Sequence, residues 1–204
     1  MTQPPNQVKE EKTLSHESNL LERSELRRQL RHQRSAIEVS TKQDWDKAIA
    51  ARLSELVQEQ RPSCLAMYWP IQSEPMLLDC FIQLHQSGIA LALPIVLAKG
   101  QALKFVAWTP GQAMEKDAYG IPMPVEREAA IVPDMVLAPC VGFNQNNYRL
   151  GYGGGFYDRT LALYPQAFSI GIAYELSQAT FMPDHYDIAL NLILTESATY
   201  SRSK

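Results

Sequence analysis

The amino-acid sequence predicts an α/β fold, a three-layer α/β/α sandwich around a mostly parallel, Rossmann-like sheet. Apolar stretches with the spacing of strands alternate with stretches of helical spacing, and two of these alternations form βαβ units. In the second unit a glycine-rich loop separates a strand from a helix. Ligands of such open sheets bind at the carboxyl ends of the strands, so the loops there are expected to form the functional site.

Chain length, charge and cysteine usage limit the function further. A chain of 204 residues is expected to form one domain with a substantial core, and its net charge of −3 disfavours a nucleic-acid partner. No apolar stretch is long enough for a membrane span or a signal peptide, so we expect a cytoplasmic protein without a membrane partner, acting as a monomer. Cys64, Cys80 and Cys140 lack CxxC spacing and are expected to be buried, reduced thiols.

The N-terminal region is expected to be helical after a polar tail. Residues 1–18 contain two prolines and a run of charges but no apolar periodicity, which predicts a disordered tail before a single domain over 19–204. Leucines at helical spacing predict a helix over 19–34. A second helix is expected over 40–60, with its apolar residues on one side.

The first βαβ unit follows these helices. It consists of a strand over 64–71, a helix over 75–86 with proline in its first turn, and a strand over 89–96. Its crossover should be right-handed. A further strand over 103–108 leads into a connection rich in proline and glycine over 110–124.

The second βαβ unit contains the glycine loop. A strand is expected over 135–143, a helix over 156–163, a strand over 168–174 and a closing strand over 190–195. Four glycines within five positions, Gly151 and Gly153 to Gly155, lie before this helix. Glycine adopts positive φ and lets a ligand approach the backbone, so the loop is suited to wrapping phosphate at a helix N-terminus.

Known phosphate motifs do not match this loop. A Walker A motif needs Gly-Lys-Ser/Thr where Phe156 and Tyr157 stand, and a dinucleotide fingerprint needs a third glycine at Phe156. The loop remains open to two readings, a phosphate cradle or a tight turn without a ligand. Arg149 before it and Asp158 after it favour the cradle, since Asp158 would hold Mg²⁺ beside phosphate; alternatively, Asp158 only stabilises the helix dipole.

Other charged residues have similar alternatives. Arg23, Arg27 and Arg31 are four residues apart, with Arg34 nearby, and form either a solvated helix face or a set of phosphate ligands. Glu74 follows the first strand, where it either contacts a ligand or begins a helix. Residues 183–187, with two aspartates around a histidine, form either a metal site or a polar turn. A Ser-His-Asp hydrolase is disfavoured because no Gly-x-Ser-x-Gly motif exists.

Taken in order, these pieces resemble the 5-formyltetrahydrofolate cyclo-ligase family, also called methenyltetrahydrofolate synthetase. The most specific part of the resemblance is the run LAPCVGFNQNNYRLGYGGGFYDRTLA, which begins at Leu137. Shorter pieces support it: SEP from Ser73, GIP from Gly120, IAYE from Ile172 and HYDIALN from His185. The match extends from about residue 21 to residue 196. One departure is Arg23, where relatives often have lysine.

The resemblance implies an ATP-dependent ligase that uses Mg²⁺ to convert 5-formyltetrahydrofolate to 5,10-methenyltetrahydrofolate, releasing ADP and phosphate. It implies that Arg149 and Asp158 are catalytic and that Mg²⁺ is held by Asp158 and Asp187. The ATP-binding residues that it implies are Arg23, Ser24, Glu25, Leu26, Arg27, Arg149, Leu150, Gly151, Tyr152, Gly153, Gly154, Gly155, Phe156 and Tyr157. The folate-binding residues that it implies are Trp69, Glu74, Tyr152, Gly153, Gly154, Gly155 and Phe156.

Two other functions stay open from the sequence. One is a folate- or nucleotide-binding protein that keeps the family fold without turnover. The other is a kinase-like or CoA-transferase-like enzyme acting on another small acid, because similar folds carry many chemistries. The glycine loop, Glu74, Asp158 and Asp187 are all present, which argues against a protein that has merely lost its activity.

Overall fold

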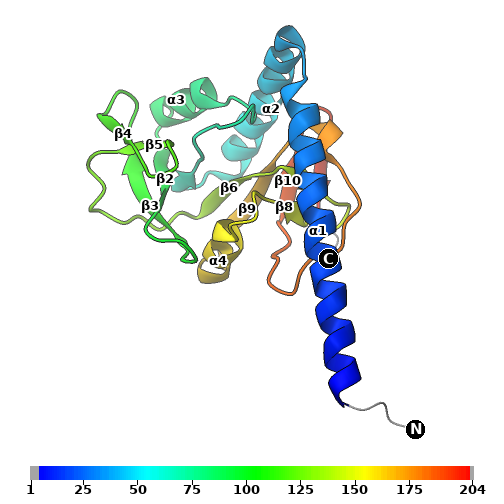
Figure 1. Cartoon of the computed structure of the whole chain (residues 1–204). Coiled ribbons are helices and arrows are strands. Elements are labelled where there is room, and N and C mark those ends of the chain that lie inside the picture. The colour runs from blue at the N-terminus through cyan, green and yellow to red at the C-terminus, as the bar shows by residue number, and fades with distance from the viewer. Residues whose placement is uncertain (1–4, 203–204) are drawn as a thin grey trace.

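The computed structural model describes the backbone of residues 5–202 and the side chains of residues 19–202. A seven-stranded sheet with strand order β11-β10-β9-β6-β1-β2-β3 forms its centre (Figure 1). These strands are β1 (Cys64–Ala66), β2 (Ala90–Val96), β3 (Leu103–Trp108), β6 (Met135–Pro139), β9 (Phe168–Ile172), β10 (Leu192–Leu194) and β11 (Thr199–Ser201). Two small hairpins accompany the sheet: β4 (Met114–Lys116) with β5 (Pro122–Pro124), and β7 (Gly142–Phe143) with β8 (Arg149–Leu150).

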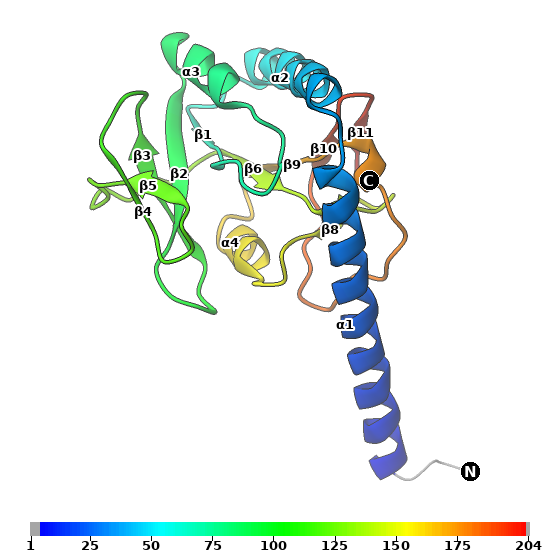
Figure 2. The ribbon, with the colours of Figure 1, turned by 45° about the horizontal axis from the view of Figure 1, so that its top comes forward.

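The helices are α1 (Pro5–Ser35), α2 (Val39–Gln60), α3 (Leu78–Gln86) and α4 (Phe156–Leu163), with a short 3-10 turn η1 (Glu175–Ser177). Helices α2 and α3 cover one face of the sheet and α4 lies on the other, as Figure 2 shows. The predicted three-layer α/β/α architecture is confirmed. Among the residues that the structure describes, no helix is long and apolar enough to cross a membrane.

The sheet is mostly parallel, as predicted. β10, β9, β6, β1 and β2 run parallel to their neighbours, while β11 and β3 pair antiparallel at the two edges. Both predicted βαβ units are present, β1-α3-β2 and β6-α4-β9. The helices fill the crossovers between parallel strands, which a two-residue turn cannot bridge.

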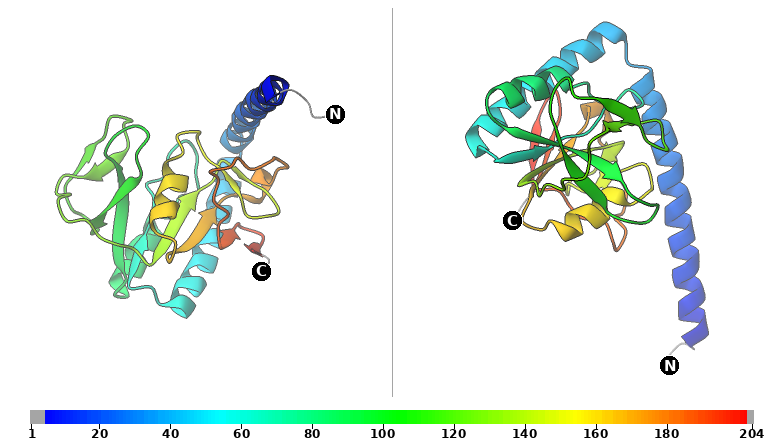
Figure 3. Two further views of the ribbon diagram at one scale, coloured as in Figure 1. Left: turned by 90° about the horizontal axis from the view of Figure 1, so that it is seen from below. Right: turned by 90° about the vertical axis from the view of Figure 1, so that its left-hand side faces the viewer.

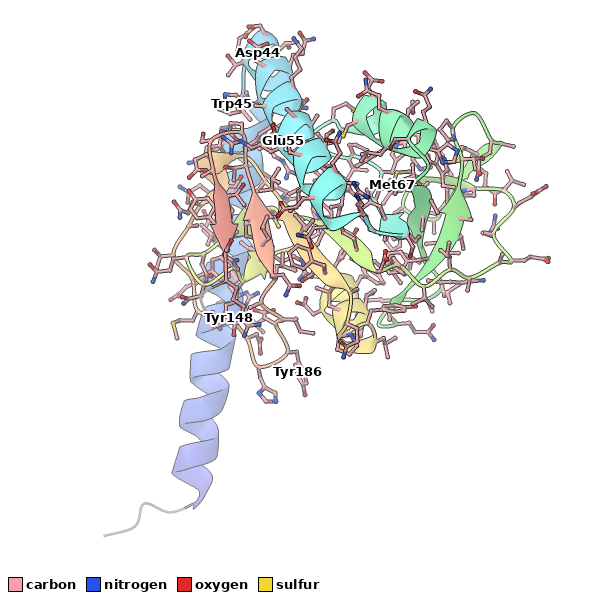
Figure 4. All side chains as sticks on the ribbon, turned by 180° about the vertical axis from the view of Figure 1, so that it is seen from behind. Asp44, Trp45, Glu55, Met67, Tyr148 and Tyr186 are labelled. Atoms are coloured by element: carbon pink, nitrogen blue, oxygen red, sulfur yellow. The ribbon has the colours of Figure 1, made fainter. Side chains whose placement is uncertain are left out.

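Side chains that alternate along each strand build a core on both faces. Leu65 and Leu137 point into the layer under α2 and α3, whereas Ala66 and Val136, their neighbours in sequence, point toward α4. This alternation follows from the two-residue period of a strand. Met67, labelled in Figure 4, belongs to the core cluster that includes residues of α2 and α3. The three cysteines are free and buried, as predicted.

Helix α1 differs from the prediction. We expected a disordered tail over 1–18; residues 5–18 instead continue α1 away from the domain, and residues 1–4 lie outside the described residues (Figures 1 and 3). The physical reason is that both prolines lie before or at the first helical position, where proline is tolerated, and the following residues include many good helix formers. The C-terminal half of α1 packs through Leu30 onto Val141 and Leu150.

Several predicted elements are shorter than expected, and three of them lie next to the candidate site. The strand predicted over 64–71 ends at Ala66, that predicted over 135–143 ends at Pro139, and the helix predicted from 75 begins at Leu78. In these three cases the regular structure is replaced by loop near the carboxyl ends of β1 and β6. These loop segments contain residues of the candidate site.

Candidate functional site

Four segments meet near the carboxyl ends of β1 and β6. They are the loop after β1, the glycine loop between β8 and α4, the second half of α1, and residues 182–188 before β10. Figure 4 shows Tyr186 on the last of these segments, pointing away from the sheet. Placement at the strand ends agrees with the rule for open α/β sheets.

The glycine loop adopts backbone conformations that favour glycine. Gly153 has a φ of 94° and Gly155, the residue that caps α4, has a φ of 63°. Gly155 has no side chain that could accept a hydrogen bond from the first N–H groups of α4. The start of this helix therefore presents backbone donors and the positive end of its dipole, which are the two features that bind an anion.

Helix α1 is joined to this loop through Arg27. Its Nε donates a hydrogen bond to the carbonyl oxygen of Gly151 at 2.8 Å. A pocket of about 140 Å³ opens between the two elements, lined by Ser24, Arg27, Arg31, Val141 and Tyr152. Three of these residues, Ser24, Arg27 and Tyr152, are among those predicted to bind ATP. A second hollow, of about 270 Å³, lies on the other side of Arg31, next to Gln72 and Ser73.

Positive charge is crowded at this pocket. Burial lowers the pKa of the Arg27 guanidinium, and the neighbouring charges of Arg23 and Arg31 lower it further, against the opposing effect of Asp187. Arg31 contacts only a backbone carbonyl and the side-chain oxygen of Gln72 among the described residues, both at 3.4 Å. An anion bound in the pocket would offset this repulsion.

Arg149 and Asp158 form a buried ion pair across the glycine loop. The Arg149 Nη1 and Nη2 atoms each donate to one carboxylate oxygen of Asp158, both at 2.9 Å, and the Arg149 side chain is only 3 % exposed. The guanidinium also lies over the ring of Tyr157, with 5.4 Å between its central carbon and the ring centroid. This two-point pairing fixes the loop on either side of its glycines.

Arg23 and Asp187 make a second ion pair close by. The Arg23 Nη1 atom donates to Asp187 Oδ2 at 2.7 Å, and both side chains are largely buried. The same oxygen accepts the backbone N–H of Asp184 at 2.8 Å. The N–H of Ile188, the residue after Asp187, donates to Asp158 Oδ1 at 3.2 Å, so the segment that carries Asp187 contacts Asp158.

The residues predicted to hold Mg²⁺ come from two segments that touch. No group of three or more His, Cys, Asp or Glu side chains suited to a metal is found within the described part of the chain. Mg²⁺ commonly takes only one or two protein carboxylates and completes its six ligands with phosphate oxygens and water. Asp158 and Asp187 fit that donor set, although an arginine engages each of them.

Glu74 is buried, with 2 % of its surface exposed, at the carboxyl end of β1. Its Oε2 accepts the backbone N–H of Ile71 at 2.9 Å, and its Oε1 accepts the hydroxyl of Tyr152, from the glycine loop, at 2.6 Å. Burial raises the pKa of this carboxyl, opposed by the two hydrogen bonds and by the positive charge of Arg34. Thus Glu74 is connected to the loop and is not simply the first residue of a helix.

Other predicted residues lie farther from this centre. Glu25 makes an exposed ion pair with Arg28, and Trp69 packs against the core under α2. Leu26 and Leu150 pack in the hydrophobic cluster that holds α1 against the domain. The ring of Phe156 lies beneath the guanidinium of Arg159, which donates to the Gly154 carbonyl at 2.5 Å.

Sequence reasoning placed Arg34 beside the other arginines of the helix, as part of a solvated face or a set of phosphate ligands, and did not predict its burial. The structure buries it to 1 % exposure, with hydrogen bonds to the loop after β1 and to Tyr152. A signal existed in its spacing, because Arg34 follows Leu26 and Leu30 at intervals of four and so continues the buried stripe of the helix.

Comparison with known proteins identifies the family. The family model of 5-formyltetrahydrofolate cyclo-ligases matches residues 19–196. The chain belongs to this family. Cyclo-ligases are ligases, so the protein is an enzyme of that class.

Individual cyclo-ligases match over nearly their whole length. The 5-formyltetrahydrofolate cyclo-ligase of Mycoplasma pneumoniae is 30 % identical over 179 residues, covering 86 % of this chain and 99 % of the relative. The Haemophilus influenzae cyclo-ligase is 25 % identical over 184 residues, covering 86 % and 98 %.

Two solved structures share the fold. The 5,10-methenyltetrahydrofolate synthetase of Mycoplasma pneumoniae superposes with a TM-score of 0.72 at 29 % identity, covering 85 % of this chain and 98 % of its own. The synthetase of Aquifex aeolicus gives a TM-score of 0.76 at 26 % identity, covering 89 % and 93 %.

Proposed function

We propose that the protein converts 5-formyltetrahydrofolate to 5,10-methenyltetrahydrofolate with ATP and Mg²⁺, releasing ADP and phosphate. In this reaction the formyl oxygen attacks the γ-phosphate of ATP, N10 then attacks the activated formyl carbon to close the ring, and the former formyl oxygen leaves as part of phosphate. We place the reaction in the cytoplasm, with small molecules as the partners and a monomer as the active unit.

The observation that supports this proposal most is the pocket between α1 and the glycine loop. It is lined by Arg27 and Arg31, whose positive charges lie close together, and by Tyr152 of the glycine loop that leads into α4. Phosphoryl transfer requires little covalent help from a protein. It depends on positioning and on neutralising the charge of the transferred group, and these residues supply both.

The arginine of each buried ion pair has a second use in this proposal. Arg149 and Arg23 carry guanidinium groups that fit phosphate oxygens as well as they fit carboxylates. Asp158 and Asp187 would hold Mg²⁺, and the charge of the ion would offset the negative charge of the phosphates. Within the chain itself, each aspartate neutralises an arginine until an anion arrives.

Folate is proposed to contact the loop after β1. Glu74 offers carboxylate lone pairs beyond those used by Tyr152 and Ile71, and Tyr152 belongs to the same glycine loop that borders the phosphate pocket. A substrate held by Glu74 would therefore lie next to the phosphates. That proximity is what an attack of one substrate on the other requires.

The test is the appearance of 5,10-methenyltetrahydrofolate absorbance when purified protein meets 5-formyltetrahydrofolate, Mg²⁺ and ATP. The reaction without ATP is the control for spontaneous ring closure, and Glu74→Gln is the variant that should weaken folate binding while leaving ATP binding intact. Product that requires ATP supports the proposal. Folate binding without product would favour the non-catalytic alternative. If the protein neither bound folate nor formed product, both readings would be refuted.

A further inference from the structure

A buried arginine lies behind the candidate folate site. The Arg34 Nη1 atom donates to the carbonyl oxygen of Cys140 at 3.2 Å, and Nη2 donates to the carbonyl oxygen of Gln72 at 3.0 Å and to the hydroxyl oxygen of Tyr152 at 2.7 Å. Its Nε is buried without a hydrogen-bond partner among the described residues. A buried cation that is only partly satisfied is costly, which indicates that it serves a purpose beyond packing.

Arg34 makes no direct ion pair within the described residues. The negative charge of Glu74 reaches it only through the hydroxyl of Tyr152. The Tyr152 hydroxyl that accepts from Arg34 at 2.7 Å also donates to Glu74 Oε1 at 2.6 Å. A phenol has one proton, and the donation from Arg34 to its oxygen directs that proton toward Glu74. Both oxygens of Glu74 consequently act as acceptors, since Oε2 accepts from the Ile71 N–H.

We propose that Arg34 is a positioning residue that acts through the Tyr152 hydroxyl to keep Glu74 ionised and oriented as a hydrogen-bond acceptor toward the folate. The proposal rests on the function proposed above. It assigns Arg34 no contact with either substrate. Without Arg34 the hydroxyl is free to turn, and a protonated Glu74 could donate to it instead.

The groups that face Glu74 are consistent with this role. Among the described residues, Arg34 is the one cation found to lower the pKa of Glu74, and the buried phenols of Tyr68 and Tyr157 and the Cys140 thiol are neutral neighbours. The pKa of the Tyr152 hydroxyl is itself raised by burial and by Glu74, so it remains a donor. With neutral phenols and a thiol around it, Glu74 depends on Arg34 to offset the effect of burial on its ionised form.

The experiment follows the Glu74 carboxyl directly by ¹³C NMR titration, assigned with Glu74→Gln, in the full chain without ligands. An opposite charge within about 4–6 Å lowers a carboxyl pKa by about 1–3 units, so removing it in Arg34→Met should raise the Glu74 midpoint by about one unit. Arg34→Lys should restore part of the shift. Arg52→Met and Arg52→Lys are the matched controls, because Arg52 on α2 donates to a backbone carbonyl, that of Ser197, away from the site.

A second readout is the affinity for 5-formyltetrahydrofolate as a function of pH, measured without ATP. Affinity should fall at low pH as Glu74 is protonated, and this acid limb of the affinity profile should move to higher pH in Arg34→Met. At pH values below the limb, folate binding should be about tenfold weaker than in the unsubstituted protein. Tyr152→Phe removes the connecting hydroxyl. Adding Arg34→Met to this variant should therefore move the acid limb by less than Arg34→Met moves it in the unsubstituted protein. Thermal melting of each variant accompanies both measurements.

The outcomes separate the two proposals. A Glu74 midpoint and an acid limb that stay in place in Arg34→Met, with lower melting temperature alone, would overturn the positioning role and leave Arg34 a structural residue. Absence of folate binding by the unsubstituted protein would refute the proposed function, while the NMR titration would still decide whether Arg34 controls Glu74. If Arg34→Met fails to fold, Arg34→Gln, which also removes the charge, supplies both readouts.

Discussion

The Arg149–Asp158 ion pair should hold the glycine loop together as well as serve the reaction, and Asp158→Asn separates these effects. The change keeps the shape of the side chain but leaves the Arg149 charge uncompensated at 3 % exposure. Breaking a buried pair from one side costs about 3–5 kcal/mol, and because Asp158 is 16 % exposed we expect the lower value. For a chain of this size that corresponds to a fall of about 6–12 °C in melting temperature.

The double variant Arg149→Met/Asp158→Leu gives the second half of the test. Replacing both charges by apolar residues removes the unpaired cation, so most of the lost stability should return. Cyclo-ligase activity should not return, since both groups are proposed to act on the phosphates or the metal. Thermal melting and the ATP-dependent assay on the unsubstituted protein, Arg149→Met, Asp158→Leu and the double variant complete a four-protein cycle and measure the two effects separately.

The control for this cycle is an exposed pair of the same charge type. Asp44 and Lys47 lie at the N-terminal part of α2, where Figure 4 shows Asp44, and their side chains are 76 % and 78 % exposed. Asp44→Asn should leave the melting temperature unchanged, because screened surface pairs contribute little. If Asp158→Asn also melted within about 2 °C of the unsubstituted protein, the pair would not be a stabilising element and the reasoning would be wrong.

Three further predictions concern packing, backbone and thiols. Gly171→Ala would place a methyl group 2.4 Å from the Cδ1 atom of Ile193 on the adjacent strand, so we expect a loss of about 1–3 kcal/mol in the free energy of unfolding by urea titration. Gly155→Ala, at a φ of 63°, should cost about 1–2 kcal/mol and weaken ATP binding measured by calorimetry; unchanged affinity would argue against the loop as phosphate cradle. Burial raises the pKa of Cys64 to about 11 and of Cys140 to about 12, so both thiols stay protonated below those values. They should react with a thiol reagent at pH 8 only after unfolding, and fast labelling of the native protein would contradict their burial.

The fold was predictable from the sequence where periodicity and burial agree. The strands β2, β3, β6 and β9 are apolar runs that are buried on both faces or alternate, and the helix α4 begins at the residue expected. The short hairpins were not predicted, because strands of two or three residues carry too few side chains to show a period. The final edge strand β11 is similarly short and largely polar.

The candidate site was predictable in its chemistry but not in its connections. Sequence alone indicated a phosphate loop, nearby arginines and two aspartates, yet it could not show that Arg23 pairs with Asp187 across 164 positions. The burial of Arg34 was missed for a related reason. Arginines usually lie at the surface, so a buried one that continues a leucine stripe looks the same in the sequence as a solvated one.

These pairings bear on how the enzyme would bind its substrates. Each arginine proposed to meet phosphate is already hydrogen-bonded: Arg23 to Asp187, Arg149 to Asp158 and Arg27 to the Gly151 carbonyl. In the proposed reaction, binding of ATP would therefore exchange existing contacts for new ones, and its affinity would be the difference between two sets of interactions. Mg²⁺ would fit this exchange, because Asp158 and Asp187 would contact the cation and leave the arginines to the phosphates. ATP and Mg²⁺ should consequently bind with positive coupling, which calorimetric titration of ATP with and without Mg²⁺ measures. Equal ATP affinities in the two titrations would contradict this double role of the aspartates.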